Sequence, residues 1–265
     1  EITYIEIDNG FTESEYLLDE GTSGIDIMRV TVAHELFHAI QRSYQPIPST
    51  NTYFYEMSSV WIEDLIYPEV NDYTRDVWTN EFFTNPDVDI TDLRGYSLAL
   101  YAHYLTSVIG DHSIMREIWE KFVNKSKAYD AIDSVLLDDY NTDFISTFIE
   151  FCSRNFFNGL NDNFYYYPDQ AETQPIRLNN YFDFNSIVTI DNLKLSDTNL
   201  GILRFNIPAG TNFEDIGVSV NVLSSDIKGN VVLLSENIES HEILDLDNMS
   251  GEYNQIENIY FVLGS

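Results

Sequence analysis

The residues best suited to chemistry lie in one short segment, in which two histidines are four residues apart and a glutamate follows the first. These residues are His34, Glu35 and His38. On a helix this spacing places both imidazoles on one face about one turn apart, as two nitrogen ligands of a tetrahedral Zn²⁺ require. Glu35 could then accept a proton from a water on the metal. The segment therefore predicts two metal ligands and a general base.

A long helix must carry this segment. Thr22 or Ser23 can cap its first turn, Asp26 adds a carboxylate there, and the apolar pattern runs to about Tyr44. That pattern leaves almost no polar side, so we expect a helix that is buried nearly all round. The alternative interpretation is a core helix whose histidines are satisfied by hydrogen bonds. We favour a metal because imidazoles and a carboxylate buried together need partners to offset their desolvation.

A catalytic zinc needs a third protein ligand and an open position. A second helix is predicted from Tyr53 to Tyr67, before Pro68, and its Glu56 and Glu63 share a stripe because seven residues make nearly two turns. Both glutamates follow the first helix far enough along the chain for the second helix to turn back past it. Each is a candidate ligand, and a solvated helix face is the alternative for both.

A third helix is predicted to open at Gly95 and to reach Gly110, with Tyr96 and His103 on one face. Either side chain could donate a hydrogen bond to an oxyanion that develops during hydrolysis. Ordinary packing is the alternative for both. Before this helix, residues 71–93 are mixed and polar. Three aspartates in that stretch could bind Ca²⁺, although it lacks the glycine and final glutamate of an EF-hand loop: Asp87, Asp89 and Asp92.

The predicted secondary structure of the chain changes from helices to short strands near residue 173. Two further amphipathic helices are predicted at residues 113–124 and 142–157, whereas the C-terminal part consists of short β-branched or aromatic runs between turn residues. We therefore expect an α+β protein with a mostly helical domain at residues 1–172 and an all-β sandwich at 173–265. The expected strands lie at residues 1–8, 186–190, 201–207, 218–222, 230–234 and 259–263.

The composition excludes some partners. The net charge is −31, with 13 Lys and Arg against 44 Asp and Glu, which disfavours nucleic acid and anionic membrane surfaces. No apolar run has the length of a membrane span, so we expect no membrane insertion. The single cysteine, Cys152, allows no intramolecular disulfide. We expect a mature or excised segment of a secreted protein.

The segment around His34 and the run Glu56-Met57-Ser58-Ser59 resemble the gluzincins, zinc metallopeptidases in which a helix some twenty residues after the two histidines carries a ligand glutamate. The likeness covers roughly residues 24–110 and extends to uncharacterised bacterial metalloproteases with a trailing β-domain. It implies a zincin-like fold. It also implies that His34, His38 and Glu56 bind Zn²⁺ while Glu35 acts as the base.

One position departs from that family. Val60 stands where thermolysin-like members have an aspartate that orients a ligand histidine, so we expect Glu63 or Asp64 to take that part. No histidine follows His38 at the close spacing of the metzincins, which excludes that group.

The resulting hypothesis is a zinc endopeptidase that acts on protein or peptide substrates. A second hypothesis is a zincin-like secreted binding or surface protein that has lost activity, although an intact Glu35 counts against it. A third is a purely structural zinc site, which would need a fourth protein ligand near Glu56.

Overall fold

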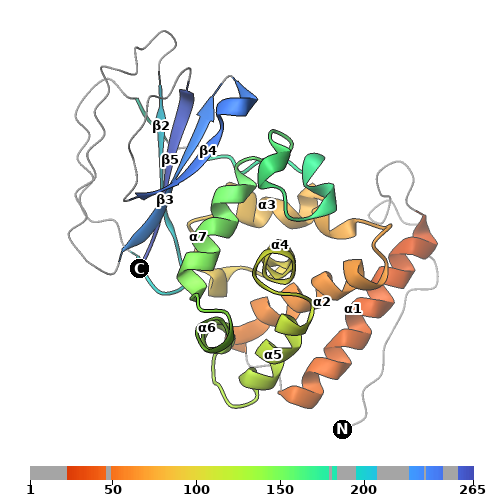
Figure 1. The fold of residues 1–265 in the computed structure, drawn as a ribbon. Helices are drawn as coiled ribbons and strands as arrows, with labels where there is room; N and C mark the ends of the chain where they lie inside the picture. Colours follow the sequence, from red (N-terminus) through yellow and green to blue (C-terminus); the bar gives the residue numbers. More distant parts are fainter. Residues whose placement is uncertain are drawn as a thin grey trace. The chain divides into compact units, whose positions relative to one another are not determined.

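The computed structural model describes residues 23–45, 49–178, 181–183, 195–207, 227–235, 237–246 and 256–265. In this part of the chain seven α-helices precede a five-stranded sheet, which confirms the expected α+β class (Figure 1). The finer expectations of a zincin-like fold and a β-sandwich stay predictions. None of the helices described is both long enough and apolar enough to cross a membrane.

The chain divides into two compact units. The first contains Glu1–Glu81 and Thr91–Asn141, and the second contains Phe82–Ile90 and Thr142–Ser265. This division differs from the expected boundary at residue 172. The reason is that the last helix, α7 (Phe144–Asn155), packs on strands β3 and β5 and belongs with the sheet.

The first unit is built around α1 (Gly24–Tyr44) and α2 (Thr52–Ile66), which lie side by side (Figure 1). A 3₁₀ turn, α4 (Ala99–Tyr104) and a π-helical turn follow one another from residue 96 to 109, where the third helix was predicted. The predicted α5 (Ser113–Phe122) is also present, and α5 and α6 (Ala128–Asp139) pack together.

The start of α1 follows the sequence expectation. The backbone N–H and the hydroxyl of Ser23 both donate to the Asp26 carboxylate, at 3.0 and 2.6 Å. These bonds satisfy groups that a helix start leaves unpaired. The expectation that α1 is buried nearly all round is wrong, since Leu36 and Ile40 are 52% and 47% exposed. They lie on the helix face opposite His34, and the histidine face is the one that meets α2.

One short helix was missed in the stretch expected to be an irregular polar loop. Helix α3 spans Asp76–Thr84 and ends on two buried aromatic residues, Phe82 and Phe83. Aromatic and β-branched residues have modest helix propensity, so the sequence alone gives a weak signal. Burial of the two phenylalanines supplies stabilisation that local propensity does not.

The second unit contains a sheet in the order β1-β2-β5-β3-β4. β1 pairs in parallel with β2, and the other neighbours are antiparallel. The strands expected at 201–207, 230–234 and 259–263 are confirmed, whereas those expected at 1–8, 186–190 and 218–222 lie outside the described residues. The strand bounds are Phe182–Asp183 (β1), Gly201–Asn206 (β2), Lys228–Ser235 (β3), Glu242–Asp245 (β4) and Ile256–Gly264 (β5).

One face of the sheet packs against helix α7, and the other face carries a cluster of buried apolar side chains. Asn230 of β3 donates to Glu150 and Ser153 of α7, at 3.1 and 3.2 Å. The next residue along the strand, Val231, points the other way into a cluster that includes Phe261. Helix α7 therefore completes the core of this unit, which is why residues 173–265 alone do not form the compact unit.

Candidate metal centre

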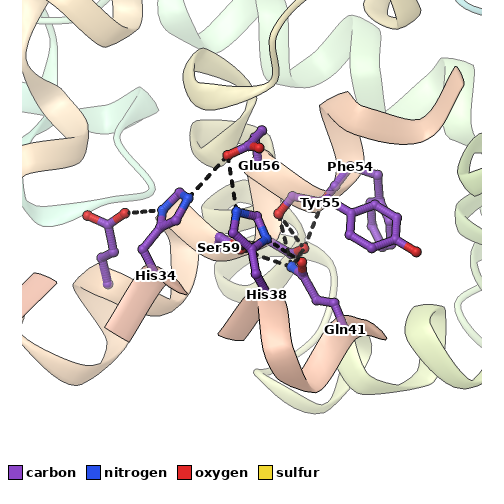
Figure 2. Close-up of polar contacts among 9 residues, drawn as sticks. His34, His38, Gln41, Phe54, Tyr55, Glu56 and Ser59 are labelled. Atoms are coloured by element: carbon purple, nitrogen blue, oxygen red, sulfur yellow. Dashed lines mark hydrogen bonds and ion pairs between the residues drawn. The ribbon is translucent and has the colours of Figure 1, made fainter. Parts of the chain in front are cut away.

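Two histidines of α1 and one glutamate of α2 meet in the seam between these helices (Figure 2). Glu56 Oε2 lies 3.1 Å from His34 Nε2 and 3.5 Å from His38 Nε2. Within the described ranges, these three residues form the group of His, Cys, Asp and Glu side chains whose ligand atoms all lie within 4.8 Å of one another. The residues predicted from the sequence as ligands are therefore brought together.

The spacing of these atoms can be compared with what a zinc ion needs. Nitrogen and carboxylate ligands bind Zn²⁺ at about 2.0–2.2 Å, so two ligands at a tetrahedral angle are separated by roughly 3.4 Å. The separations of 3.1 and 3.5 Å from Glu56 to the two imidazoles bracket that value. The donor set, two nitrogens and one carboxylate oxygen, is also one that zinc accepts. The residues present fit the ion in both spacing and chemistry.

Glu63 takes a different place from Glu56. Its Oε1 lies 2.6 Å from Nδ1 of His34, the ring nitrogen on the far side from Glu56. Its neighbour Asp64 faces another histidine, with Oδ2 3.7 Å from His103 Nε2. The seven-residue stripe on α2 therefore puts Glu56 among the converging ligand atoms and Glu63 behind His34, where it can orient the ring.

His38 is held by a residue that the sequence analysis missed. Gln41 Oε1 lies 2.7 Å from His38 Nδ1, and Ser59 Oγ lies 3.1 Å from the same nitrogen (Figure 2). Gln41 is fully buried and donates from Nε2 to the Tyr55 carbonyl at 2.9 Å. Gln41 could have been identified from the sequence by its position, because it follows His38 by three residues and so lies about one turn further along the same helix face.

The electrostatics of the seam favour a positive charge. Burial lowers the pKa of His34, but the hydrogen bonds and charges of Glu56 and Glu63 outweigh burial and raise it to about 9. Burial raises the pKa of Glu56, yet its contacts with His34 and His38 prevail and lower it to about 2. Burial raises the pKa of Glu63 to about 7 against the opposing effect of His34. Without a metal, a protonated His34 supplies the positive charge.

Tyr96 reaches this seam and His103 has other neighbours. The Tyr96 ring stacks on His34, with centroids 6.0 Å apart and planes 9° from parallel. Burial raises the pKa of Tyr96 to about 12, and the charge of Glu56 and a hydrogen bond from the Tyr96 hydroxyl to its carboxylate act in the same direction. Its hydroxyl therefore keeps its proton at neutral pH and can donate it.

Gly95 explains how Tyr96 comes so close to α2. Its φ of +101° is a left-handed conformation, and a Cβ atom built on it would lie 2.2 Å from the Tyr53 carbonyl oxygen. Only glycine can make this turn at this distance from the second helix. The turn starts the helical run with Tyr96 beside the candidate metal centre.

The remaining predicted site residues occupy the following places. Glu35 is exposed on α1, immediately after His34. His103 is buried, with its ring 4.5 Å from that of Tyr73, and burial, helped by His112, lowers its pKa, so the ring is neutral. It therefore has core contacts as well as an N–H to donate.

Within the described part of the chain, the three aspartates considered for calcium do not form a cluster of converging ligand atoms like that of His34, His38 and Glu56. Asp89 accepts a hydrogen bond from Thr198 Oγ1 at 2.6 Å. Calcium binding stays a prediction. A separate apolar cavity of about 150 Å³ lies between α1, α2 and α5, with Gln41, Trp61 and Trp119 among its walls.

Comparisons of the chain with models of known protein families, with curated proteins and with solved structures give no match. The function of this chain is therefore inferred from the geometry of this site.

Proposed function

We propose that this chain is a zinc-dependent endopeptidase whose metal is held by His34, His38 and Glu56. One observation carries the proposal. Three ligand atoms from α1 and α2 converge within 4.8 Å of one another, and Glu56 Oε2 lies 3.1 and 3.5 Å from the two imidazole nitrogens, while Glu35 is exposed on the same helix as the histidines. Three protein ligands leave a fourth position for a water or a substrate carbonyl, which is the arrangement of a catalytic zinc.

Bound zinc would supply two effects, a lowered pKa of water, to about 7, and polarisation of the scissile carbonyl. Glu35 accepts the proton of the attacking water and delivers it to the leaving amine. Its exposure on α1 lets it reach solvent and substrate, whereas Glu56 and Glu63 are engaged by the imidazoles. This difference in contacts assigns the base to Glu35.

Tyr96 is the better supported donor to the developing oxyanion. Its ring stacks on His34 and its hydroxyl stays protonated at neutral pH. His103 remains the second candidate, but its contacts with Tyr73 and Asp64 are those of a packed side chain. Removing one oxyanion donor typically costs about 10²- to 10³-fold in kcat.

Two other functions are weighed against this one. A structural zinc site needs a fourth protein ligand, and in the described ranges the converging group has three members. A zincin-like binding protein without activity does not require a base beside the metal, and Glu35 is intact. A protein or peptide substrate and a secreted location belong to the same proposal.

The test is the Glu35→Gln variant, with zinc content and peptide cleavage measured on the same sample. Glutamine keeps the size of the side chain but lacks the basic oxygen. We expect full zinc occupancy and a loss of kcat of about 10²- to 10⁴-fold. Equal cleavage by wild type and by zinc-loaded Glu35→Gln would contradict the assigned base. A wild type that holds zinc but cleaves no member of a peptide library would favour the binding protein.

A further inference from the structure

The two imidazoles of the candidate metal centre are oriented by chemically different groups. A carboxylate, Glu63 of α2, faces Nδ1 of His34 at 2.6 Å, whereas a carboxamide, Gln41 of α1, faces Nδ1 of His38 at 2.7 Å. An ionised carboxylate only accepts hydrogen bonds, but a carboxamide accepts at one end and donates at the other. The effect of Gln41 on His38 therefore depends on which way its amide points.

The surroundings of the Gln41 amide nitrogen settle that orientation. The Tyr55 carbonyl, 2.9 Å from Nε2, can only accept. Ser58 Oγ, 3.0 Å from the same nitrogen, already donates its proton to the Phe54 carbonyl at 2.7 Å. A flipped amide would set the Gln41 oxygen against the Tyr55 carbonyl oxygen, two acceptors in a buried place. Nε2 must face α2, so Oε1 must face His38.

The tautomer of His38 follows from this orientation. Oε1 of Gln41 has no proton to give, so Nδ1 of His38 has to donate one. In a neutral imidazole the other nitrogen, Nε2, then carries a lone pair. Glu56 Oε2 lies 3.5 Å from Nε2, a longer contact than the 2.7 Å between Gln41 Oε1 and Nδ1, so the shorter contact decides which nitrogen keeps the proton. We propose that Gln41 is a positioning residue that fixes His38, in the metal-free protein, as the Nδ1–H tautomer with Nε2 ready to bind a metal.

A neutral partner suits this position. Gln41 is 1% exposed, and the Glu56 and Glu63 carboxyl groups already face the imidazoles. A carboxylate at position 41 would bury a further charge and would oppose the Tyr55 carbonyl. The carboxamide orients His38 without either cost. That Gln41 orients His38 for a metal rests on the proposed function, whereas the tautomer of His38 is a property of the metal-free protein.

The first test is ¹⁵N NMR of the imidazole nitrogens of metal-free wild type at pH 8, with the His38 signals assigned by their absence in His38→Ala. We expect a proton on Nδ1 and an unprotonated Nε2. A proton on Nε2 with none on Nδ1 would overturn the proposal. This measurement needs no zinc and no altered Gln41.

The second test is Gln41→Met, which keeps the side-chain length and the apolar cavity but removes the acceptor. We expect zinc to bind about 10- to 100-fold more weakly and His38 to populate both tautomers. Ser58→Ala is the matched control, because it removes a partner of Gln41 Nε2 but no hydrogen bond to His38 described above, and it should keep zinc affinity and tautomer.

Ser59 Oγ lies 3.1 Å from His38 Nδ1 and accepts a hydrogen bond from Gln41 Nε2 at 3.0 Å, so Gln41→Met combined with Ser59→Ala removes both polar neighbours of Nδ1 and should weaken zinc binding further. Unchanged zinc affinity and an unchanged tautomer in the double variant would overturn the proposal. If wild type binds no zinc, the proposed function fails, and the NMR measurement still decides the inference about Gln41.

Discussion

Both compact units bury polar side chains, but of different kinds. In the second unit three buried amides satisfy one another: Gln170 donates to Asn158 at 2.7 Å, and Asn158 donates to Asn155 at 3.2 Å. In the first unit the buried groups between α1 and α2 are ionisable, and Glu56 Oε2 faces ring nitrogens of both His34 and His38. One network is neutral and the other is charged.

The difference separates a structural network from a candidate site. Amides pair donor to acceptor and need nothing else, so the cluster around Asn158 is explained by stability alone. Two imidazoles and two carboxylates are costly to bury unless a positive charge lies among them. Glu56 and Glu63 raise the pKa of His34 to about 9 in spite of burial, which shows that this network favours a positive charge. A metal ion can supply that charge.

The largest effect on zinc binding is expected when a histidine of the charged network is replaced. His34→Ala or His38→Ala should abolish zinc binding, because each would remove one of the three proposed protein ligands. His241→Ala is the matched control, since His241 is a buried histidine of the second unit whose Nε2 faces the Ser235 carbonyl. Zinc content measured after dialysis should fall only in the first two variants. Undiminished zinc in both would refute the site.

The next effect concerns the hydroxyl at the edge of the seam. Tyr96→Phe keeps the ring that stacks on His34 and removes the donor, so kcat should fall about 10²- to 10³-fold while zinc affinity changes little. The measurement is steady-state cleavage of the best library peptide by zinc-loaded protein. An unchanged kcat would transfer the oxyanion role to His103 or elsewhere.

The third effect is a pH dependence of the metal-free protein. The folded-state pKa of His34 is raised from 6.5 to about 9, so its stabilisation is fully present below pH 6.5 and is lost as pH rises through 9. The loss is at most about 3 kcal/mol of unfolding free energy.

Urea unfolding with a chelator at pH 6 and pH 10 measures this loss, and His34→Gln, which cannot titrate, is the control. Zinc-loaded protein should depend less on pH over this range, because the metal binds the neutral ring. Equal pH dependence of metal-free wild type and His34→Gln would contradict the assignment.

The smallest effect distinguishes the acidic residues of α2. Glu63→Gln should weaken zinc binding only about 10- to 100-fold, because Glu63 orients His34 without touching the metal. Asp64→Asn, whose carboxylate faces His103, should leave zinc affinity unchanged. Glu56→Ala should remove the zinc. If Glu63→Gln strips the metal and Glu56→Ala does not, the two glutamates exchange roles.

Local patterns predicted the elements that carry this site. The spacing of His34 and His38 and the seven-residue interval from Glu56 to Glu63 are properties of a helix, so they could be read before any packing was known. What remained open was which glutamate faces the ligand nitrogens, because that depends on how α2 rotates against α1.

The features missed by the sequence analysis depend on contacts between distant segments. Gln41 is an ordinary helix residue until its amide meets the Tyr55 carbonyl on α2. Helix α7 was placed correctly, but its packing on strands more than seventy residues later in the chain cannot be inferred from periodicity. The expected boundary at residue 172 followed the change in composition, whereas the compact units follow those long-range contacts.

The most direct test of the central claim is a crystal grown with zinc and measured on both sides of the zinc absorption edge. We predict one strong anomalous peak in each molecule, about 2.0–2.2 Å from His34 Nε2, His38 Nε2 and a Glu56 carboxylate oxygen. A peak bound by Glu63 instead of Glu56, or the absence of any peak between α1 and α2, would contradict it.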